Sequence, residues 1–78
     1  MRTTKWRAMK ILNSADYGTY LRKRRKEMGY TQGDLSELTG LSVSFISDVE
    51  RGKPTAELEK VIGLTKWLGV DLCLEVRS

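Results

Sequence analysis

The side chains of this 78-residue chain that could do chemistry are mostly hydroxyls, cations and carboxylates, and the histidine that would activate a nucleophile is missing. The sequence has no histidine and one cysteine, Cys73, so neither a Cys-His nor a Ser-His-Asp arrangement can be built. Residues 52–55, Gly-Lys-Pro-Thr, are similar to part of a phosphate loop, but the proline interrupts it and Ser47 stands where the first glycine belongs. We therefore expect no enzyme, no metal site and no cofactor.

Basic charge is concentrated in the first third of the chain. Residues 1–30 hold nine Lys or Arg against two acidic residues, a net charge of +7, whereas residues 31–78 hold five against eight, a net charge of −3. This asymmetry suggests a polyanion on one face, although a solvated helix face explains a charged run equally well. The sequence contains neither a signal peptide nor an apolar run long enough to span a membrane, and we expect a cytoplasmic protein.

Four helices are predicted to position these side chains. Capping residues and apolar periodicity place them at about 14–28, 32–39, 43 to 50 or 51, and 56–68. The expected N-caps are Asn13, Thr31, Ser42 and Thr55. Gly40 permits a sharp reversal between the second and third helices. The fourth helix should turn Leu58, Val61, Ile62, Thr65 and Leu68 inward, which leaves Leu64 and Trp67 either at a dimer contact or in an enlarged core.

From Val70 onward the apolar period changes from 3.6 residues to 2, which predicts a β-strand. Its apolar positions are Val70, Leu72, Leu74 and Val76. Because a lone strand leaves its backbone groups unpaired, this one must pair with the N-terminal segment or with the same strand of another subunit. For residues 1–12 two interpretations remain, an extra strand or a basic N-terminal arm.

The two short helices around a glycine turn resemble the Cro/repressor (XRE) family of helix-turn-helix proteins. The resemblance covers residues 16–69 and is carried by Leu21-Arg22, Arg25, Gly29-Tyr30-Thr31-Gln32, Leu35, Gly40-Leu41-Ser42, Ile46-Ser47 and Val49-Glu50-Arg51-Gly52. Ser36 departs from the alanine most common in the family. The resemblance implies a mainly α, lambda-repressor-like bundle of four to five helices with a C-terminal strand, and a repressor that binds double-stranded DNA.

The resemblance also implies which side chains meet DNA. In the family, the residue at the position of Gln32 contacts the DNA backbone. The residues at the positions of Ser42, Val43, Ser44, Ser47 and Asp48 face the major groove. Short hydroxyls can bond phosphates or several bases, and a valine can touch a thymine methyl. For Ser42, helix capping is an equally good role.

Charged residues near this segment divide into phosphate contacts and structural pairs. Arg22, Arg51 and Lys53 are the main candidates for phosphate contacts, with Lys23 and Lys26 behind them. Asp48 is unfavourable near phosphates unless it accepts from a cytosine amino group or pairs with Arg51, and we favour the pairing. Arg25 and Glu50 match a partly buried salt bridge that joins the first and third helices in the family.

The segment from Gly52 to Leu74 is similar to the HipB-type antitoxins. In those relatives the C-terminal strands of two subunits pair into a lid over the dimer, and the protein represses its own operon and holds a HipA-like serine/threonine kinase toxin. The division implied is an N-terminal arm or strand (1–12), a helix-turn-helix domain (13–69) and a dimerisation strand (70–78). The partners implied are a palindromic operator, a second copy of the chain and the toxin. The location implied is the cytoplasm of a bacterium, in association with the nucleoid. A stand-alone phage or operon repressor and a restriction-modification controller are the alternatives.

Overall fold

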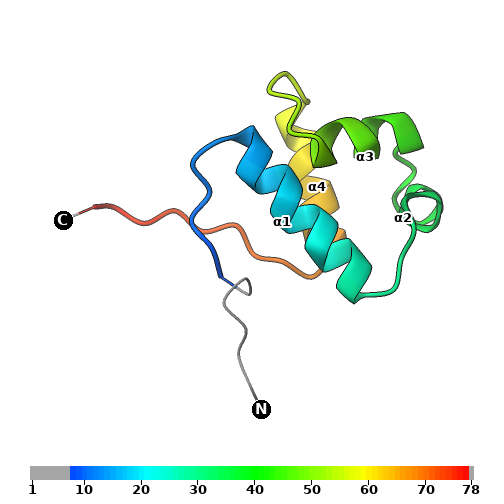
Figure 1. Ribbon diagram of the computed structural model, residues 1–78, viewed down its shortest axis with the longest axis horizontal. Helices are drawn as coiled ribbons and strands as arrows, with labels where there is room; N and C mark the ends of the chain where they lie inside the picture. The colour runs from blue at the N-terminus through cyan, green and yellow to red at the C-terminus, as the bar shows by residue number, and fades with distance from the viewer. Residues whose placement is uncertain (1–7, 78) are drawn as a thin grey trace, which may run out of the picture.

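The computed structural model describes residues 8–77, which form four helices joined by short connections (Figure 1). These are α1 (Ser14–Glu27), α2 (Gln32–Thr39), α3 (Val43–Glu50) and α4 (Leu58–Trp67). α1 crosses in front of α4, and the α2–α3 pair lies on the far side of α1 from the C-terminal segment (Figure 1). The expected mainly helical class is confirmed.

Local capping explains where the first three helices begin. The side chains of Asn13, Thr31 and Ser42 each accept a hydrogen bond from the backbone N–H three residues further on, at 2.8, 3.0 and 3.0 Å. At α2 the bond is reciprocated, because the Thr31 N–H donates to the Asp34 carboxylate at 3.0 Å and closes a capping box. These three predicted caps are confirmed.

The prediction that Thr55 caps the fourth helix is wrong. Residues 53–56 instead form a turn in which the Ala56 N–H donates to the Lys53 carbonyl at 3.4 Å, so α4 begins only at Leu58. Glu57 occupies the N-cap position and makes no side-chain cap bond. With the helix starting at Leu58, that side chain lies 68% exposed rather than in the core.

The core is assembled from one apolar stripe on each helix. Its buried hydrophobic residues are Leu21, Leu35, Ile46, Val49, Val61, Leu64 and Leu68. Leu64 is 1% exposed, so of its two expected places the enlarged core is observed and the dimer contact is not, whereas Trp67 is 53% exposed. Of the residues on the fourth helix that were expected to face inward, Val61, Thr65 and Leu68 are buried, Ile62 is half-buried and Leu58 is exposed. Leu64 joins the buried set, at spacings of three and four from Val61 and Leu68.

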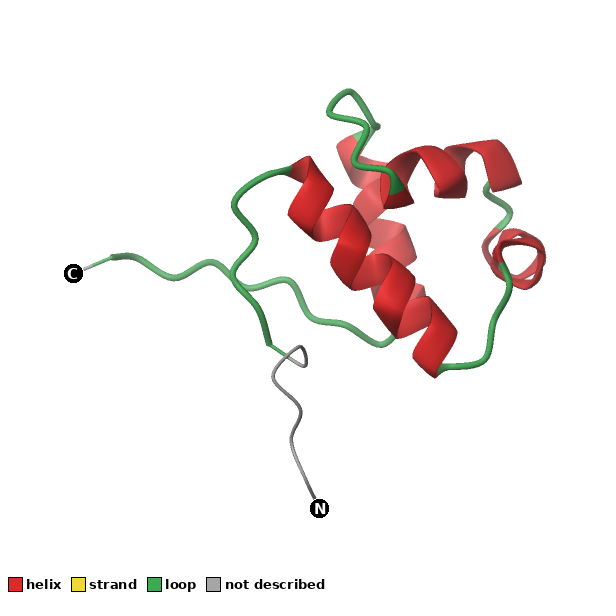
Figure 2. Cartoon of the chain, in the orientation of Figure 1, coloured by secondary structure: helices red, strands yellow, loops and turns green. Residues whose placement is uncertain are grey.

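The predicted C-terminal strand is absent from the single chain. Residues 70–77 form no strand, and none of residues 8–77 is drawn as one (Figure 2). Val70 is held by its N–H, which donates to the Thr65 carbonyl at 3.1 Å, but Leu74 and Val76 are fully exposed. A strand needs a hydrogen-bonded neighbour, and residues 8–12 form no strand beside this segment. The expected pairing with the N-terminal segment is therefore not observed among the described residues. Residues 1–7 lie outside the described part of the chain.

Candidate nucleic-acid interface

The turn between α2 and α3 is fixed by glycine geometry and two side-chain hydrogen bonds. Gly40 has φ of 78°, the left-handed conformation that other residues rarely adopt. The Ser36 hydroxyl donates to the Leu41 carbonyl at 2.6 Å, and the Leu41 N–H donates to the Thr39 hydroxyl at 3.1 Å. Serine at position 36 therefore does more than fit the helix crossing, because it ties α2 to the residue that begins the approach to α3.

α1 approaches α3 so closely that a side chain would not fit between them. A Cβ built on Gly18 would lie 2.3 Å from the Val49 carbonyl oxygen and 2.6 Å from that of Glu50. Sequence reasoning missed this residue. The signal that could have found it is an isolated glycine inside a helical pattern, which often marks close backbone contact.

A buried ion pair fastens the end of α3 to α1. The Arg25 Nε donates to Glu50 Oε2 at 2.6 Å and its Nη2 donates to Glu50 Oε1 at 3.0 Å, with side chains 8% and 4% exposed. The remaining Arg25 nitrogen, Nη1, donates to the Tyr30 carbonyl at 2.8 Å. Gln32, expected to reach the DNA backbone, is half-buried and donates to Glu50 Oε1 at 3.0 Å. The first residue of α2 thus joins the same network as the last residue of α3.

The outward face of α3 presents few free polar groups. Val43 is 44% exposed and Ser44 is exposed, and within residues 8–77 neither side chain has a polar partner. The Ser42 hydroxyl is engaged as the N-cap of the helix. The Ser47 hydroxyl accepts from Arg51 Nη1 at 2.7 Å. The exposed α3 side chains that make no polar contact within residues 8–77 therefore lie in the first turn of the helix.

Asp48 is neutralised by two cations beside this face. Its carboxylate pairs with Arg51 Nη2 at 2.5 Å and with Lys53 Nζ at 3.5 Å. Both cations remain largely open to solvent, with side chains 70% and 52% exposed. Sharing two positive charges around one carboxylate leaves a net positive site at the C-terminal end of α3.

A second group of cations lies on the exposed face of α1. Arg22, Lys23 and Lys26 border a shallow depression of about 290 Å³ that Thr19 and Glu50 complete. Since Glu50 is the last residue of α3, the structure brings Arg22 to the same side of the molecule as the α2–α3 unit.

Two ionisable groups near these helices have shifted pKa values. Hydrogen bonds from the backbone and then the hydroxyl of Thr31 hold the pKa of the Asp34 carboxyl below its ordinary range, which keeps a negative charge at the start of α2. Burial raises the pKa of the Tyr17 phenol to about 12. Its hydroxyl donates to the Val61 carbonyl at 3.1 Å and contacts the Thr65 hydroxyl, which links α1 to α4.

Residues 21–74 match the helix-turn-helix family, and this segment includes α2, the Gly40 turn and α3. The chain belongs to that family. A relative from Sinorhizobium fredii, named an uncharacterized HTH-type transcriptional regulator, y4mF, is 38% identical over 65 residues, which are 83% of this chain and 86% of the relative. No solved structure matches the chain significantly.

This helix-turn-helix protein shows two further features in its described residues. Its longest helix, α1, has 14 residues, and no helix in the range 8–77 is long and apolar enough to cross a membrane. The same range holds no group of three or more Cys, Asp and Glu side chains placed to bind a metal ion.

Proposed function

We propose that this protein is a sequence-specific DNA-binding transcription regulator that places the first turn of α3 in the major groove. The observation that carries the proposal is the contrast between the two sides of α3, where Ile46 and Val49 are buried while Val43 and Ser44 are bare. A helix anchored on one side and open at its first turn is what base reading by a helix-turn-helix unit requires.

Contacts to the DNA backbone are assigned to the cations that flank this helix. Arg51 and Lys53 lie at its C-terminal end, and Arg22 lies beside Glu50 on α1. Gln32 would donate to a phosphate by exchanging its bond with Glu50, whose carboxylate keeps both bonds from Arg25. Ser42, Ser47 and Asp48 are already engaged within the chain, so we assign them supporting contacts rather than the main reading of bases.

The test separates base reading from charge. A duplex is first selected from a random-sequence pool by the wild-type protein, and dissociation constants are measured by fluorescence anisotropy for that duplex and a scrambled one. Val43→Ala and Ser44→Ala should reduce the preference for the selected duplex. Arg51→Ala should weaken both duplexes and lower the salt slope by about one unit. Lys66→Ala, which removes an exposed cation from the last turn of α4, is the matched control. Equal effects of every α3 substitution on both duplexes would refute base reading.

For the biological role, we propose an antitoxin that represses its own operon, binds a palindromic operator as a homodimer and neutralises a HipA-like kinase toxin. What supports this proposal is the resemblance of residues 52–74 to HipB-type antitoxins. The test is co-expression with the product of the adjacent reading frame. Co-purification of a kinase would support the antitoxin role, whereas a neighbouring methyltransferase or phage gene would favour a controller protein or a stand-alone repressor.

A further inference from the structure

The first turn of α3 offers a ligand one apolar side chain and one free hydroxyl, those of Val43 and Ser44. Further along the helix, Ser47 and Asp48 are already bonded to Arg51. None of the eight residues of α3 is Arg, Lys, Asn or Gln, the types that read guanine or adenine through two hydrogen bonds. Base reading by this helix therefore depends on an apolar contact and a hydroxyl.

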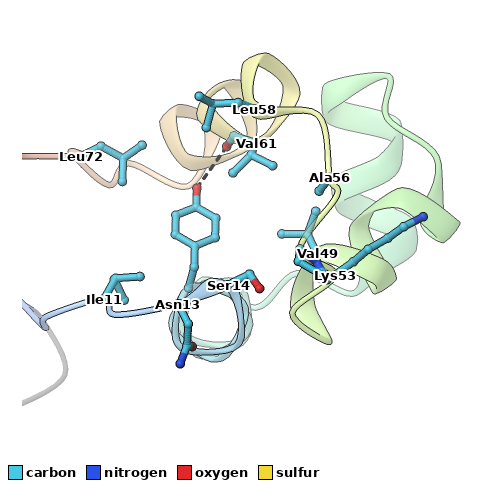
Figure 3. Close-up of a pocket in the computed structure, with 11 residues that line it drawn as sticks. Ile11, Asn13, Ser14, Val49, Lys53, Ala56, Leu58, Val61 and Leu72 are labelled. Atoms are coloured by element: carbon cyan, nitrogen blue, oxygen red, sulfur yellow. Dashed lines mark hydrogen bonds between the residues drawn. The ribbon is translucent and has the colours of Figure 1, made fainter.

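The opposite end of α3 is held in the body of the protein. Val49 is 3% exposed and lines an apolar depression of about 330 Å³ between α1 and α4, which Val61 also lines (Figure 3). Val43, at 44% exposed, belongs neither to the core nor to the lining of that depression. Packing within residues 8–77 therefore does not account for an apolar side chain at this position.

The apolar group that a major groove presents to such a side chain is a methyl group on C5 of a pyrimidine. Thymine carries this methyl and cytosine does not. Methylation of cytosine at C5 places the same group at the same position of the groove. Contact with the isopropyl group of Val43 therefore separates thymine from uracil, and 5-methylcytosine from cytosine, but does not separate thymine from 5-methylcytosine.

The hydroxyl of Ser44 does not separate these two bases either. At C4 thymine presents an oxygen that accepts a hydrogen bond, whereas cytosine presents an amino group that donates one. A serine hydroxyl rotates to donate to the first or to accept from the second. The carboxylate that would favour the amino group, that of Asp48, is engaged by Arg51 and Lys53.

We propose that this protein reads a C5 methyl group and accepts 5-methylcytosine in place of thymine at the base pair that Val43 contacts. Methylation of a cytosine at that position would then strengthen binding, so the occupancy of a site would depend on its methylation state. The inference rests on the proposed function, because it requires the first turn of α3 to lie in the major groove.

The first experiment locates the methyl group that is read. In the duplex selected from a random pool by the wild-type protein, each thymine is replaced in turn by uracil, which removes the methyl and leaves the pairing with adenine intact. Fluorescence anisotropy should show about fourfold weaker binding at one such position, the change expected for uncovering one methyl group. Val43→Ala should lose this difference between thymine and uracil.

The second experiment tests 5-methylcytosine at the position so located. The thymine–adenine pair is replaced by cytosine–guanine, with and without a methyl on C5 of the cytosine. The wild-type protein should bind the methylated duplex about fourfold more tightly than the unmethylated one, and within a factor of about two of the thymine duplex.

Three variants at exposed apolar side chains show whether Val43 makes the contact. Val43→Ala should bring the ratio of the methylated to the unmethylated affinity close to one, whereas Val43→Ile, which keeps a branched apolar side chain, should preserve it. Leu38→Ala removes a side chain of matched exposure, 42%, from α2 and should leave the ratio unchanged.

Failure of this inference can be distinguished from failure of the proposed function. A wild-type protein that prefers its selected duplex, yet tolerates uracil at every position or binds the 5-methylcytosine duplex no better than the cytosine duplex, overturns methyl reading and leaves the function standing. A methyl effect that persists in Val43→Ala also overturns the inference. Equal affinity of the wild type for the selected and scrambled duplexes refutes the sequence-specific function, and methyl reading with it.

Discussion

Breaking the buried ion pair between Arg25 and Glu50 should have a large effect on stability, while replacing both residues should have a small one. Arg25→Met leaves a carboxylate that is 4% exposed without its two charged donors, and it also removes the donor to the Tyr30 carbonyl. An uncompensated buried charge costs about 3–5 kcal/mol. Glu50→Leu leaves the opposite charge unpaired and should have a similar cost.

The double variant Arg25→Met/Glu50→Leu removes both charges at once. Replacing a buried pair by apolar residues is often neutral or stabilising. Here Gln32 and the Tyr30 carbonyl each lose a partner, at about 1 kcal/mol apiece, so we expect a net loss of no more than about 2 kcal/mol. The coupling energy of the cycle should then exceed about 4 kcal/mol.

The assay is urea unfolding followed by circular dichroism at neutral pH. Arg51→Met is the control, because the Asp48–Arg51 pair has an arginine side chain 70% exposed and should contribute at most about 1 kcal/mol. Additive single losses, or single losses no larger than that of Arg51→Met, would refute the view that this pair is what fastens α3 to α1.

Three further predictions concern the helices that hold the interface. Gly18→Ala should lower the free energy of unfolding by about 1–3 kcal/mol in urea denaturation, since its Cβ would meet the Val49 backbone. Gly63→Ala on α4 is the control, because its Cβ would meet open space, and it should raise the free energy of unfolding by about 0.5–1 kcal/mol. A gain in stability at both positions would show that α1 and α3 separate easily. Thr31→Ala should lower the free energy of unfolding by about 1 kcal/mol in the same assay, because it removes the cap of α2, and Thr31→Ser should not. The pKa of Tyr17 is raised in the folded state to about 12, so the unfolded chain loses the phenolic proton first and the free energy of unfolding should fall as pH rises from about 10 to 12. Urea titration at successive pH values measures this fall, which should be shallower for Tyr17→Phe. An identical pH dependence in the variant would contradict the burial of the Tyr17 phenol.

Sequence reasoning located what local interactions decide. The caps at Asn13, Thr31 and Ser42 and the turn at Gly40 depend on residues within four positions of one another, and the structure has them where the pattern predicts. The helix-turn-helix segment could therefore be predicted from local sequence, without any tertiary contact.

Errors arose where a distant segment decides the outcome. Whether Leu58 or Leu64 faces the core is decided by how α4 packs against the other helices, which propensity does not specify. The Gly18 crossing likewise needs knowledge of where the α3 backbone lies. The strand from Val70 was predicted from a real alternation, but a strand needs a neighbour, and no neighbour is present among residues 8–77 of one chain.

The small reading face of α3 explains why the proposed dimer and the proposed function need each other. If Val43 and Ser44 together discriminate by about 2 kcal/mol between right and wrong bases, one unit prefers its site by only about 30-fold. Two linked units add their free energies, so the preference becomes roughly 1,000-fold, and the second unit binds at the millimolar effective concentration typical of short connections. A chain that ends at Gly69, and so lacks the proposed dimerisation strand, should therefore keep its salt-dependent affinity for any duplex but lose most of its preference for a palindrome. If that variant discriminated between selected and scrambled duplexes as well as the wild type does, a single α3 would be reading enough bases by itself, and the additive account of specificity would be wrong.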